Sequence, residues 1–266
     1  MEFIGFILAV VIGLLLSLLG GGGSILTVPV LVYVFGIDPT LATAYSLLVV
    51  GTGSAAASLT YWRRGLASPK VALFFSFPSF VMVFLTRRFV LPFLPDVLLT
   101  AGGFTLTKST FLMLLFALMM VLASFSMIRG GSRREGADDF AFARQLNYPL
   151  IFTEGLLMGT LTGLVGVGGG FLIVPVLTHR VNLPIRLAVG TSLLIIAINS
   201  LVGMLGDVGQ HPMNWPFLGK FLGLSLIGVG VGTQLSRRID SKHLKPAFGW
   251  FTLLMGTGIL IRELVV

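Results

Sequence analysis

The sequence predicts an all-α integral membrane protein made of two inverted repeats. Each repeat is expected to hold a glycine-broken, re-entrant helix pair and three transmembrane helices. Of the 266 residues, 55% are hydrophobic and 11% are charged, whereas soluble domains carry roughly 25% charged residues. Several apolar runs approach or exceed the roughly 20 residues that cross a bilayer core. The two halves of the chain also repeat each other's glycines, prolines and serines.

Composition excludes several classes of protein. A chain with a mean hydropathy of +0.99 has too little polar surface for a cytosolic enzyme, a nucleic-acid binder or a disordered scaffold. The absence of cysteine excludes disulfides, zinc-thiolate sites and thiol catalysis. The net charge of +8 comes largely from arginine pairs between apolar runs, which are typical of loop anchors beside a membrane. The pairs are Arg63-Arg64, Arg87-Arg88, Arg133-Arg134 and Arg237-Arg238.

The first apolar run covers residues 3–35. The start Met1-Glu2-Phe3-Ile4 lacks the basic region of a signal peptide, so we expect this run to stay in the mature protein. A continuous helix of this length would measure about 50 Å, far more than a bilayer core needs. The run Gly20 to Gly23 interrupts it, and four glycines make a poor helix. We therefore expect two shorter helices.

The remaining elements follow in order. Repeat 1 (residues 1–128) continues with helices at 40–62, 69–86 and 109–128. A hydrophilic stretch at 129–147 is expected to be a cytoplasmic linker. Repeat 2 (148–266) opens with a second broken run at 149–180, interrupted at Gly166 to Gly170. Helices are expected at 183–205, 216–236 and 246–261. The runs do not alternate as the strands of a membrane barrel would.

A shift of 146 residues superimposes the two halves without a gap. It carries Gly13 onto Gly159 and Pro29 onto Pro175. It also pairs Gly20 with Gly166, Gly22 with Gly168, Gly23 with Gly169, Ala42 with Ala188, Ser46 with Ser192, and Ser54 with Ser200. Chance could align leucines in so apolar a chain, but not glycine, proline and serine together, so the chain is an internal duplication.

Two arrangements of the broken runs are consistent with their length. If each run crosses the membrane once, the 18 Lys and Arg residues divide evenly between the two sides. If each run dips in and returns to the same side, 13 of the 18 fall on one side. Basic residues concentrate in the cytoplasm, so the charge distribution favours the re-entrant arrangement. It predicts an internal linker and two external termini.

Broken helices and inverted repeats are typical of secondary transporters, which bind substrate near the midplane where half-helix ends meet. The N–H groups that open a helix attract anions, and glycine allows close backbone approach. We expect the second half-helices to open at Ser24 to Thr27 and at Gly170 to Ile173. Polar side chains of the neighbouring helices complete the candidate site. The predicted binding residues are Gly22, Gly23, Ser24, Ser46, Gly168, Gly169, Gly170, Ser192 and Asn199.

Other polar residues give weaker signals. Glu154 lies within an apolar run and is a candidate proton carrier, although a position at the interface explains it equally well. Asp207 is expected at the membrane interface. The Gly219-x-x-x-Gly223 and Gly228-x-x-x-Gly232 pairs are typical of close helix packing, within one chain or in a homodimer. His179, His211 and His243 lack metal-ligand spacing. Neither a nucleotide loop nor a catalytic set is present, so we expect no enzyme activity, cofactor or metal.

Two phrases carry a resemblance to a known family. Gly20–Leu31 with Ala42–Leu47, and Gly166–Leu177 with Ala188–Leu193, each join a glycine break to Val-Pro-Val-Leu and Ala-x-x-x-Ser-Leu. This doubled pattern resembles the sulfite exporter TauE/SafE family. The resemblance covers nearly the whole chain, and residues 80–108 fit it least.

The resemblance implies export of small sulfur-containing anions such as sulfite, sulfonates or related organic acids. We therefore expect a multi-pass secondary transporter of the inner membrane, whose partners are a small anion and the lipid bilayer, with no nucleic acid. The alternatives are a passive anion channel and a non-transporting membrane assembly protein.

Overall fold

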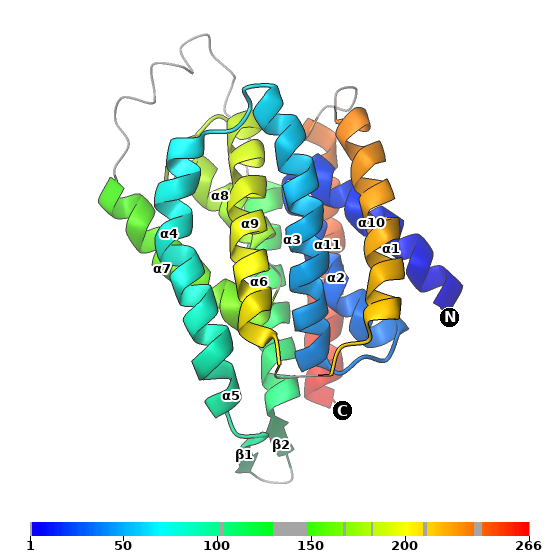
Figure 1. The fold of residues 1–266 in the computed structure, drawn as a ribbon. Coiled ribbons are helices and arrows are strands. Elements are labelled where there is room, and N and C mark those ends of the chain that lie inside the picture. The colour runs from blue at the N-terminus through cyan, green and yellow to red at the C-terminus, as the bar shows by residue number, and fades with distance from the viewer. Residues whose placement is uncertain are drawn as a thin grey trace.

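The structure is a computed structural model of the chain. It describes residues 2–101, 104–129, 148–166, 169–181, 183–209, 212–236 and 241–265. Helices make up nearly all of it, arranged side by side in one bundle (Figure 1). The all-α expectation is confirmed at this level, and the only strands among the described residues form one short hairpin.

The first half of the chain begins with a broken helix and continues with long ones. Its elements are α1 (Glu2–Leu19), α2 (Ser24–Pro29), the π-helical turn η1 (Val30–Val34), α3 (Pro39–Arg63), α4 (Pro69–Leu85), the π-helical turn η2 (Thr86–Val90), α5 (Leu91–Phe93), β1 (Val97–Ala101), β2 (Phe104–Thr107) and α6 (Lys108–Arg129).

The second half repeats this order without the hairpin. Its elements are α7 (Tyr148–Val165), α8 (Gly170–His179), α9 (Ile185–Asp207), α10 (Trp215–Leu235) and α11 (Ser241–Val265). The linker at 130–147 lies outside the described residues.

Prolines and polar caps fix where several long helices start. Pro39, Pro69 and Pro216 lie in the first turns of α3, α4 and α10, where a missing N–H costs nothing. Asp38 accepts a 2.8 Å hydrogen bond from the Thr40 amide, and Asn214 caps α10 in the same way. These local signals explain why α3, α4 and α10 start within one residue of the expected positions. α11 instead starts at Ser241, five residues before the expected 246.

The region at 80–108 differs from expectation. The helix expected at 69–86 continues through η2 and α5, which gives one apolar stretch from Pro69 to Phe93. The antiparallel β1–β2 hairpin then joins it to α6. Its strands are rich in β-branched and apolar residues around a glycine pair at 102–103, a pattern typical of a hairpin but too short for a strand of a membrane barrel.

Each broken helix packs against a helix of the other half. α1 lies along α10, and α7 lies along α4. A Cβ atom at Gly13 would collide with the carbonyl oxygen of Ser225, and one at Gly159 would collide with that of Ser79. The 146-residue shift relates both members of these contacts. Each half therefore packs its broken helix against the other half through the same kind of contact.

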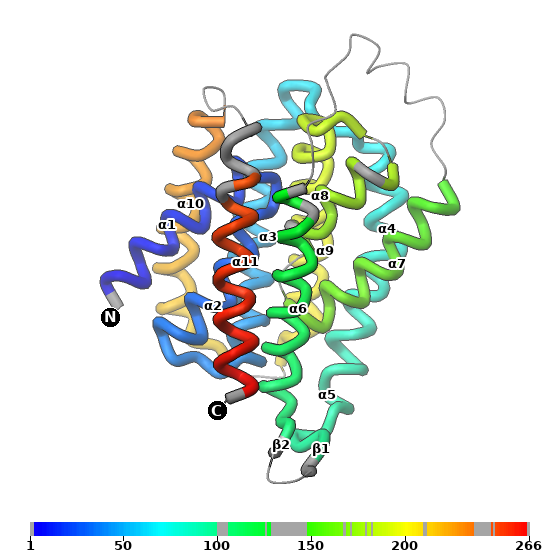
Figure 2. The backbone as a smooth tube through the Cα atoms, turned by 180° about the vertical axis from the view of Figure 1, so that it is seen from behind, coloured from blue at the N-terminus to red at the C-terminus, as the bar shows by residue number. Residues whose placement is uncertain are grey.

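The two halves of each broken helix run in opposite directions along the bundle. In Figure 1, α1 rises from the lower right and α2 with η1 leads back down, whereas α7 descends from the upper left and α8 leads back up. Figure 2 shows the same courses from behind. The α3–α4 connection and the start of α9 lie together, where the Ser68 amide donates a 2.9 Å hydrogen bond to the Thr191 hydroxyl.

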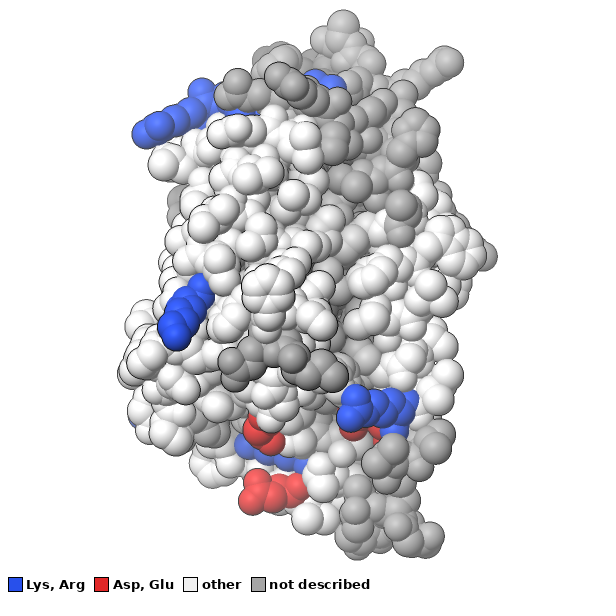
Figure 3. Space-filling view, turned by 90° about the vertical axis from the view of Figure 1, so that its right-hand side faces the viewer, with Lys and Arg blue, Asp and Glu red and all other residues white. Residues whose placement is uncertain are grey.

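In the described part of the chain, six helices are long and apolar enough to cross a membrane. They are Pro39–Arg63, Pro69–Phe93, Lys108–Phe125, Tyr148–Val165, Ile185–Asp207 and Trp215–Leu235. α11 has 25 residues but is not in this set. Leu73, Leu205 and Leu254 are more than 60% exposed on the outside of the bundle, which suits contact with lipid. Figure 3 shows a broad uncharged region on one face, with most of its charged side chains above and below it.

Candidate functional site

The first break is a tight turn made by glycines. Gly20 and Gly21 have positive φ angles of 66° and 110°, which residues with a side chain rarely adopt. The amides of Ser24, Ile25 and Leu26 donate to the carbonyls of Gly21, Gly22 and Gly23. α2 therefore opens at Ser24 as expected, and its cap Gly23 already has helical angles.

The second break has a similar shape. Gly166 and Gly169 have positive φ angles of 71° and 70°. The Gly166 amide donates to the Thr162 carbonyl at 2.8 Å, and the amides of Leu172 and Ile173 donate to the Gly169 carbonyl. Gly168, one of the predicted binding residues, lies outside the described residues. Gly169 is therefore the cap of α8, and the second half-helix opens at Gly170 as expected.

The two breaks touch each other. A Cβ built on Gly21 would lie 2.5 Å from the Cα atom of Gly170, and a Cβ built on Gly170 would lie 2.6 Å from the Cα atom of Gly21. Only glycine permits this approach, because a real Cβ atom essentially never comes so close to another heavy atom. The ends of α2 and α8 are therefore brought together from opposite halves of the chain.

The long helices α3 and α9 each contact the break of the opposite half of the chain. Gly20 packs against Val189 of α9, and Gly166 packs against Thr43 of α3. Ser192 of α9 donates a 2.8 Å hydrogen bond to the carbonyl of Gly20. Ser24 Oγ donates to the Gly21 carbonyl at 2.6 Å. These two predicted site hydroxyls thus satisfy carbonyls of the first break, which a helix interruption inside a membrane requires.

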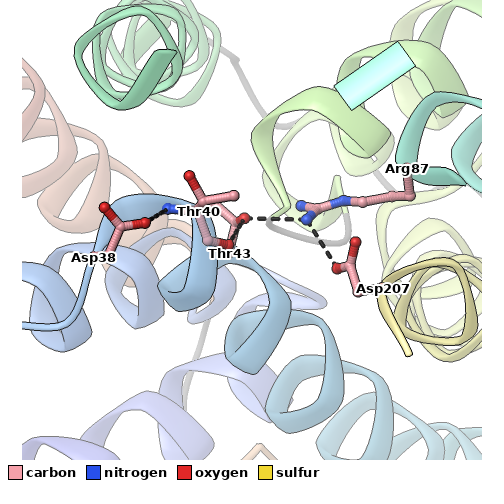
Figure 4. Close-up of polar contacts among 5 residues, drawn as sticks. All are labelled: Asp38, Thr40, Thr43, Arg87 and Asp207. Carbon is pink, nitrogen blue, oxygen red and sulfur yellow. Dashed lines mark hydrogen bonds and ion pairs between the residues drawn. The ribbon is translucent and has the colours of Figure 1, made fainter. Parts of the chain in front are cut away.

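A buried ion pair lies beside the second break. Arg87, in η2, is 0% exposed, and its Nη1 atom lies 2.9 Å from Asp207 Oδ2 at the end of α9. The same nitrogen donates to Thr43 Oγ1 at 3.1 Å. A Cβ at Gly166 would collide with Arg87 Nη2 and with Thr43. Figure 4 shows Arg87 reaching from its helix toward both Thr43 and Asp207.

The sequence analysis missed this pair. It expected Arg87 to anchor a loop, which is wrong because Arg87 lies within η2 and is 0% exposed. Asp207 ends α9 as expected, but its side chain is 1% exposed and pairs with Arg87 inside the bundle. The available signal was the apolar sequence on both sides of the arginine pair, from Val81 to Leu85 and from Phe89 to Leu94. Arg88, the other member of the pair, is exposed, so only one of two adjacent arginines enters the bundle.

Several buried hydroxyls have no hydrogen-bond partner among the described residues. Ser46 Oγ, Thr162 Oγ1 and Thr27 Oγ1 are of this kind, as are Ser54 Oγ and Ser200 Oγ. Asn199 donates to Ser79 Oγ at 2.7 Å, but its Oδ1 atom has no partner there. Unpaired buried polar groups are rare in native proteins and call for an explanation such as a ligand or water.

Glu154 lies away from the breaks, in the first half of α7. It is 9% exposed, and its Oε1 atom lies 3.7 Å from Nε of Arg180, which follows α8. The Arg180 side chain is 67% exposed, so this contact is at the edge of the bundle. Among the described residues, His, Asp and Glu side chains form no group of three that could hold a metal ion.

An apolar helical bundle with six membrane-length helices among the described residues, and with two interrupted helices whose breaks touch, defines a multi-pass membrane protein. The chain belongs to the sulfite exporter TauE/SafE family, whose sequence model matches residues 5–259. The resemblance inferred from the two glycine phrases is thereby confirmed.

Similar proteins cover nearly the full chain. A "Probable membrane transporter protein" of Xylella fastidiosa (strain Temecula1) is 29% identical over 255 residues, which is 95% of this chain and 92% of that protein. "Probable membrane transporter protein YunE" of Bacillus subtilis (strain 168) is 23% identical over 96% of this chain and 97% of its own length. The family is thus one of membrane transporters rather than of enzymes.

Proposed function

We propose that the protein is a secondary transporter that exports small sulfur-containing anions, namely sulfite, sulfonates or related organic acids. The anion binds near the membrane midplane, where the breaks meet. The observation that carries this proposal is the backbone contact between Gly21 and Gly170. It brings two half-helix N-terminal ends together, and their partial positive charges favour an anion. The family's description as sulfite exporters supports the substrate class.

The breaks are re-entrant, and the repeats are inverted. The opposite courses of α1 and α7 in Figure 1 support this, since each broken helix returns toward the end from which it came. The four loops that hold 13 of the 18 Lys and Arg residues are the loops that this arrangement assigns to the cytoplasm. The protein then resides in the inner membrane with both termini external.

A carrier fits the packing of the breaks better than a channel. Gly20, Gly21 and Gly170 are buried and in tight contact, so an anion needs a rearrangement to pass. Ser24 and Ser192 donate hydrogen bonds to carbonyls of the first break. The path of the anion is surrounded by the other predicted binding residues, which are Ser46, Asn199, Gly22, Gly23, Gly169 and Gly170. Gly168 completes the second glycine run. A channel would instead need a permanently open polar path.

Two further parts of the proposal concern coupling and assembly. Glu154 couples export to protons, because a nearly buried carboxylate in an apolar helix is costly unless it is used. Two copies of the chain associate through the outer face of α10, where the structure has nothing within 4 Å of a Cβ at Gly219 or Gly223. Gly228 and Gly232, by contrast, pack on α1 of the same chain.

Counterflow in proteoliposomes tests the transport function. Vesicles are loaded with unlabelled sulfite and diluted into radiolabelled sulfite, and the label inside is followed. A carrier accumulates label transiently, and the rate saturates with sulfite. Flux that never saturates and shows no counterflow indicates the passive channel. Absence of flux for sulfite and for small sulfonates, in protein that remains folded, supports the membrane assembly protein and rejects the proposal.

A further inference from the structure

The two breaks have the same backbone shape but different surroundings. The 146-residue shift relates each residue beside the first break to one beside the second. At the second break these residues are polar or charged: Thr43, Thr162, Arg87 and Asp207. Their counterparts at the first break are Val189, Leu16, Thr233 and Tyr61. Among these four pairs, both charged side chains lie at the second break.

The first break is closed by its neighbours. Tyr61, the counterpart of Asp207, donates a 3.1 Å hydrogen bond to the carbonyl of Ser17. Ser192 donates to the Gly20 carbonyl, and Val189 packs directly on Gly20. The aromatic ring and the aliphatic side chain fill this position, and the hydroxyl groups of Ser24, Tyr61 and Ser192 donate to protein carbonyls. Thr27 Oγ1, further along α2, has no partner among the described residues.

Donors at the second break remain available. Ser46, the counterpart of Ser192, is 0% exposed, and its hydroxyl has no partner among the described residues. Thr162 is 1% exposed, its hydroxyl also lacks a partner there, and a Cβ at Gly169 would collide with that hydroxyl. The Thr162 hydroxyl therefore points into the turn that opens α8, where a bound anion would find both amide and hydroxyl donors.

The Arg87–Asp207 ion pair places a positive charge beside the second break, which suits an anion. Burying Arg87 and Asp207 costs desolvation energy, and such pairs in membrane segments mark functional sites more often than they add stability. A guanidinium group also suits an oxyanion, because its planar fork donates two parallel hydrogen bonds to carboxylate or sulfonate oxygens. Asp207 Oδ2 holds one position of that fork.

We propose that the anion binds where the breaks meet, on the side of the second break, with Arg87 as its ligand and Asp207 as the counter-ion that the anion replaces. The first break supplies no charged ligand. This proposal rests on the transport function proposed above and assigns its charge recognition to one residue. Thr43 orients the guanidinium through the 3.1 Å hydrogen bond, and Gly166 leaves the space that Arg87 Nη2 occupies.

Three variants and a control test the assignment: Arg87→Gln, Asp207→Asn, the double variant with both changes, and Arg64→Gln. Arg64 contacts the carbonyl of Thr233 at 3.4 Å, so it is an arginine beside the first break. Purified proteins are melted in detergent with sodium sulfite or with sodium chloride of equal ionic strength. Sulfite flux is then measured in proteoliposomes.

The thermal shifts separate a ligand from a structural link. At sulfite concentrations near 100 times Kd we expect the wild-type and Arg64→Gln midpoints to rise by roughly 5–10 °C. Asp207→Asn melts lower than wild type in chloride, because it leaves a buried charge unpaired, and it gains a larger rise with sulfite, because no carboxylate competes. Arg87→Gln shows no rise.

The double variant removes both charges at once. We expect it to melt near wild type in chloride, with no sulfite-dependent rise and no flux. Wild-type binding and flux in this variant overturn the assignment while the transport function stands. If the double variant does not fold, Asp207→Asn decides, since a sulfite-dependent rise no larger than that of wild type also overturns it. Absence of flux from the wild type rejects the transport function, and this assignment with it.

Discussion

Ser192 donates a 2.8 Å hydrogen bond to the backbone carbonyl of Gly20, across 172 residues of sequence. The same hydroxyl also lies 2.8 Å from the carbonyl of Val189 in its own helix. The bond ties α9 of one half to the break of the other and satisfies an oxygen that a continuous helix would have paired internally. Its counterpart Ser46 makes no such bond to any residue that the structure describes, although its position in α3 is equivalent.

This difference predicts unequal effects of two matched substitutions. Ser192→Ala leaves the buried Gly20 carbonyl without its side-chain donor and should lower the free energy of unfolding by about 1–2 kcal/mol. Ser46→Ala removes a hydroxyl with no partner among the described residues and should leave the stability unchanged or slightly higher. Thermal melts of both variants in the same detergent check this. Equal destabilisation by the two substitutions contradicts the account of the break.

Close packing of α7 on α4 predicts a strong effect of one methyl group. In Gly159→Ala the added Cβ would collide with the Ser79 carbonyl and approach its Cα at 2.8 Å. Forcing the helices apart should cost about 1–3 kcal/mol. Gly219→Ala is the matched control, because nothing lies within 4 Å of its Cβ. Melting midpoints that fall equally for both would contradict the packing of each broken helix against the other half.

Leucine at the breaks should stop transport. Gly169→Leu places a side chain against the Thr162 hydroxyl and demands a left-handed backbone at the second break, which costs about 1–2 kcal/mol. Gly22→Leu meets Leu19 at 2.8 Å and Phe248 at 3.2 Å. We expect folded protein, judged by a single symmetric gel-filtration peak, with no sulfite counterflow. Wild-type flux in both variants would count against the site.

The absence of cysteine permits single-cysteine mapping of the topology. Asp96→Cys introduces an exposed thiol between α5 and β1, and Ser132→Cys introduces one in the linker at 129–147. In intact cells an impermeant maleimide should label the first and reach the second only after permeabilisation. The reverse pattern would reject external termini, and labelling of both would reject this assignment of sides.

Proton coupling through Glu154 has its own signature. Glu154→Gln removes the charge but keeps the size of a side chain that is 9% exposed. Counterflow needs no net driving force, so we expect it to persist, whereas sulfite export driven by a pH gradient should be lost. Unchanged gradient-driven export would show that Glu154 only pairs with Arg180 at the edge of the bundle.

Much of the fold could be predicted because it follows from composition and repetition. The glycine runs marked both breaks, since glycine alone tolerates the positive φ angles found at Gly20 and Gly166. Helix starts followed from prolines such as Pro39. The site was harder to predict from the sequence than the fold. Arg87 was hidden beside Arg88, because nothing in a single sequence tells which of two adjacent arginines enters the bundle and which faces outward.

The roles of the Ser46 and Ser192 hydroxyls could not be predicted from the sequence either. Ser46 and Ser192 are equivalent in the repeat, yet Ser192 donates to a carbonyl while Ser46 has no partner within the described part of the chain. Their difference depends on contacts between helices from opposite halves, which the spacing within one helix does not encode. The same holds for Asp207, whose pairing with Arg87 joins residues 120 positions apart.

The central claim is that a small oxyanion binds where the two breaks meet. The most direct measurement is the anomalous difference density of crystals soaked with selenite, the heavier congener of sulfite. We predict one dominant selenium peak at the turn that opens α8, within hydrogen-bond distance of the Gly170 amide or the Arg87 guanidinium. Selenium density found only at the surface, with the breaks in contact and empty at saturating selenite, would contradict the account.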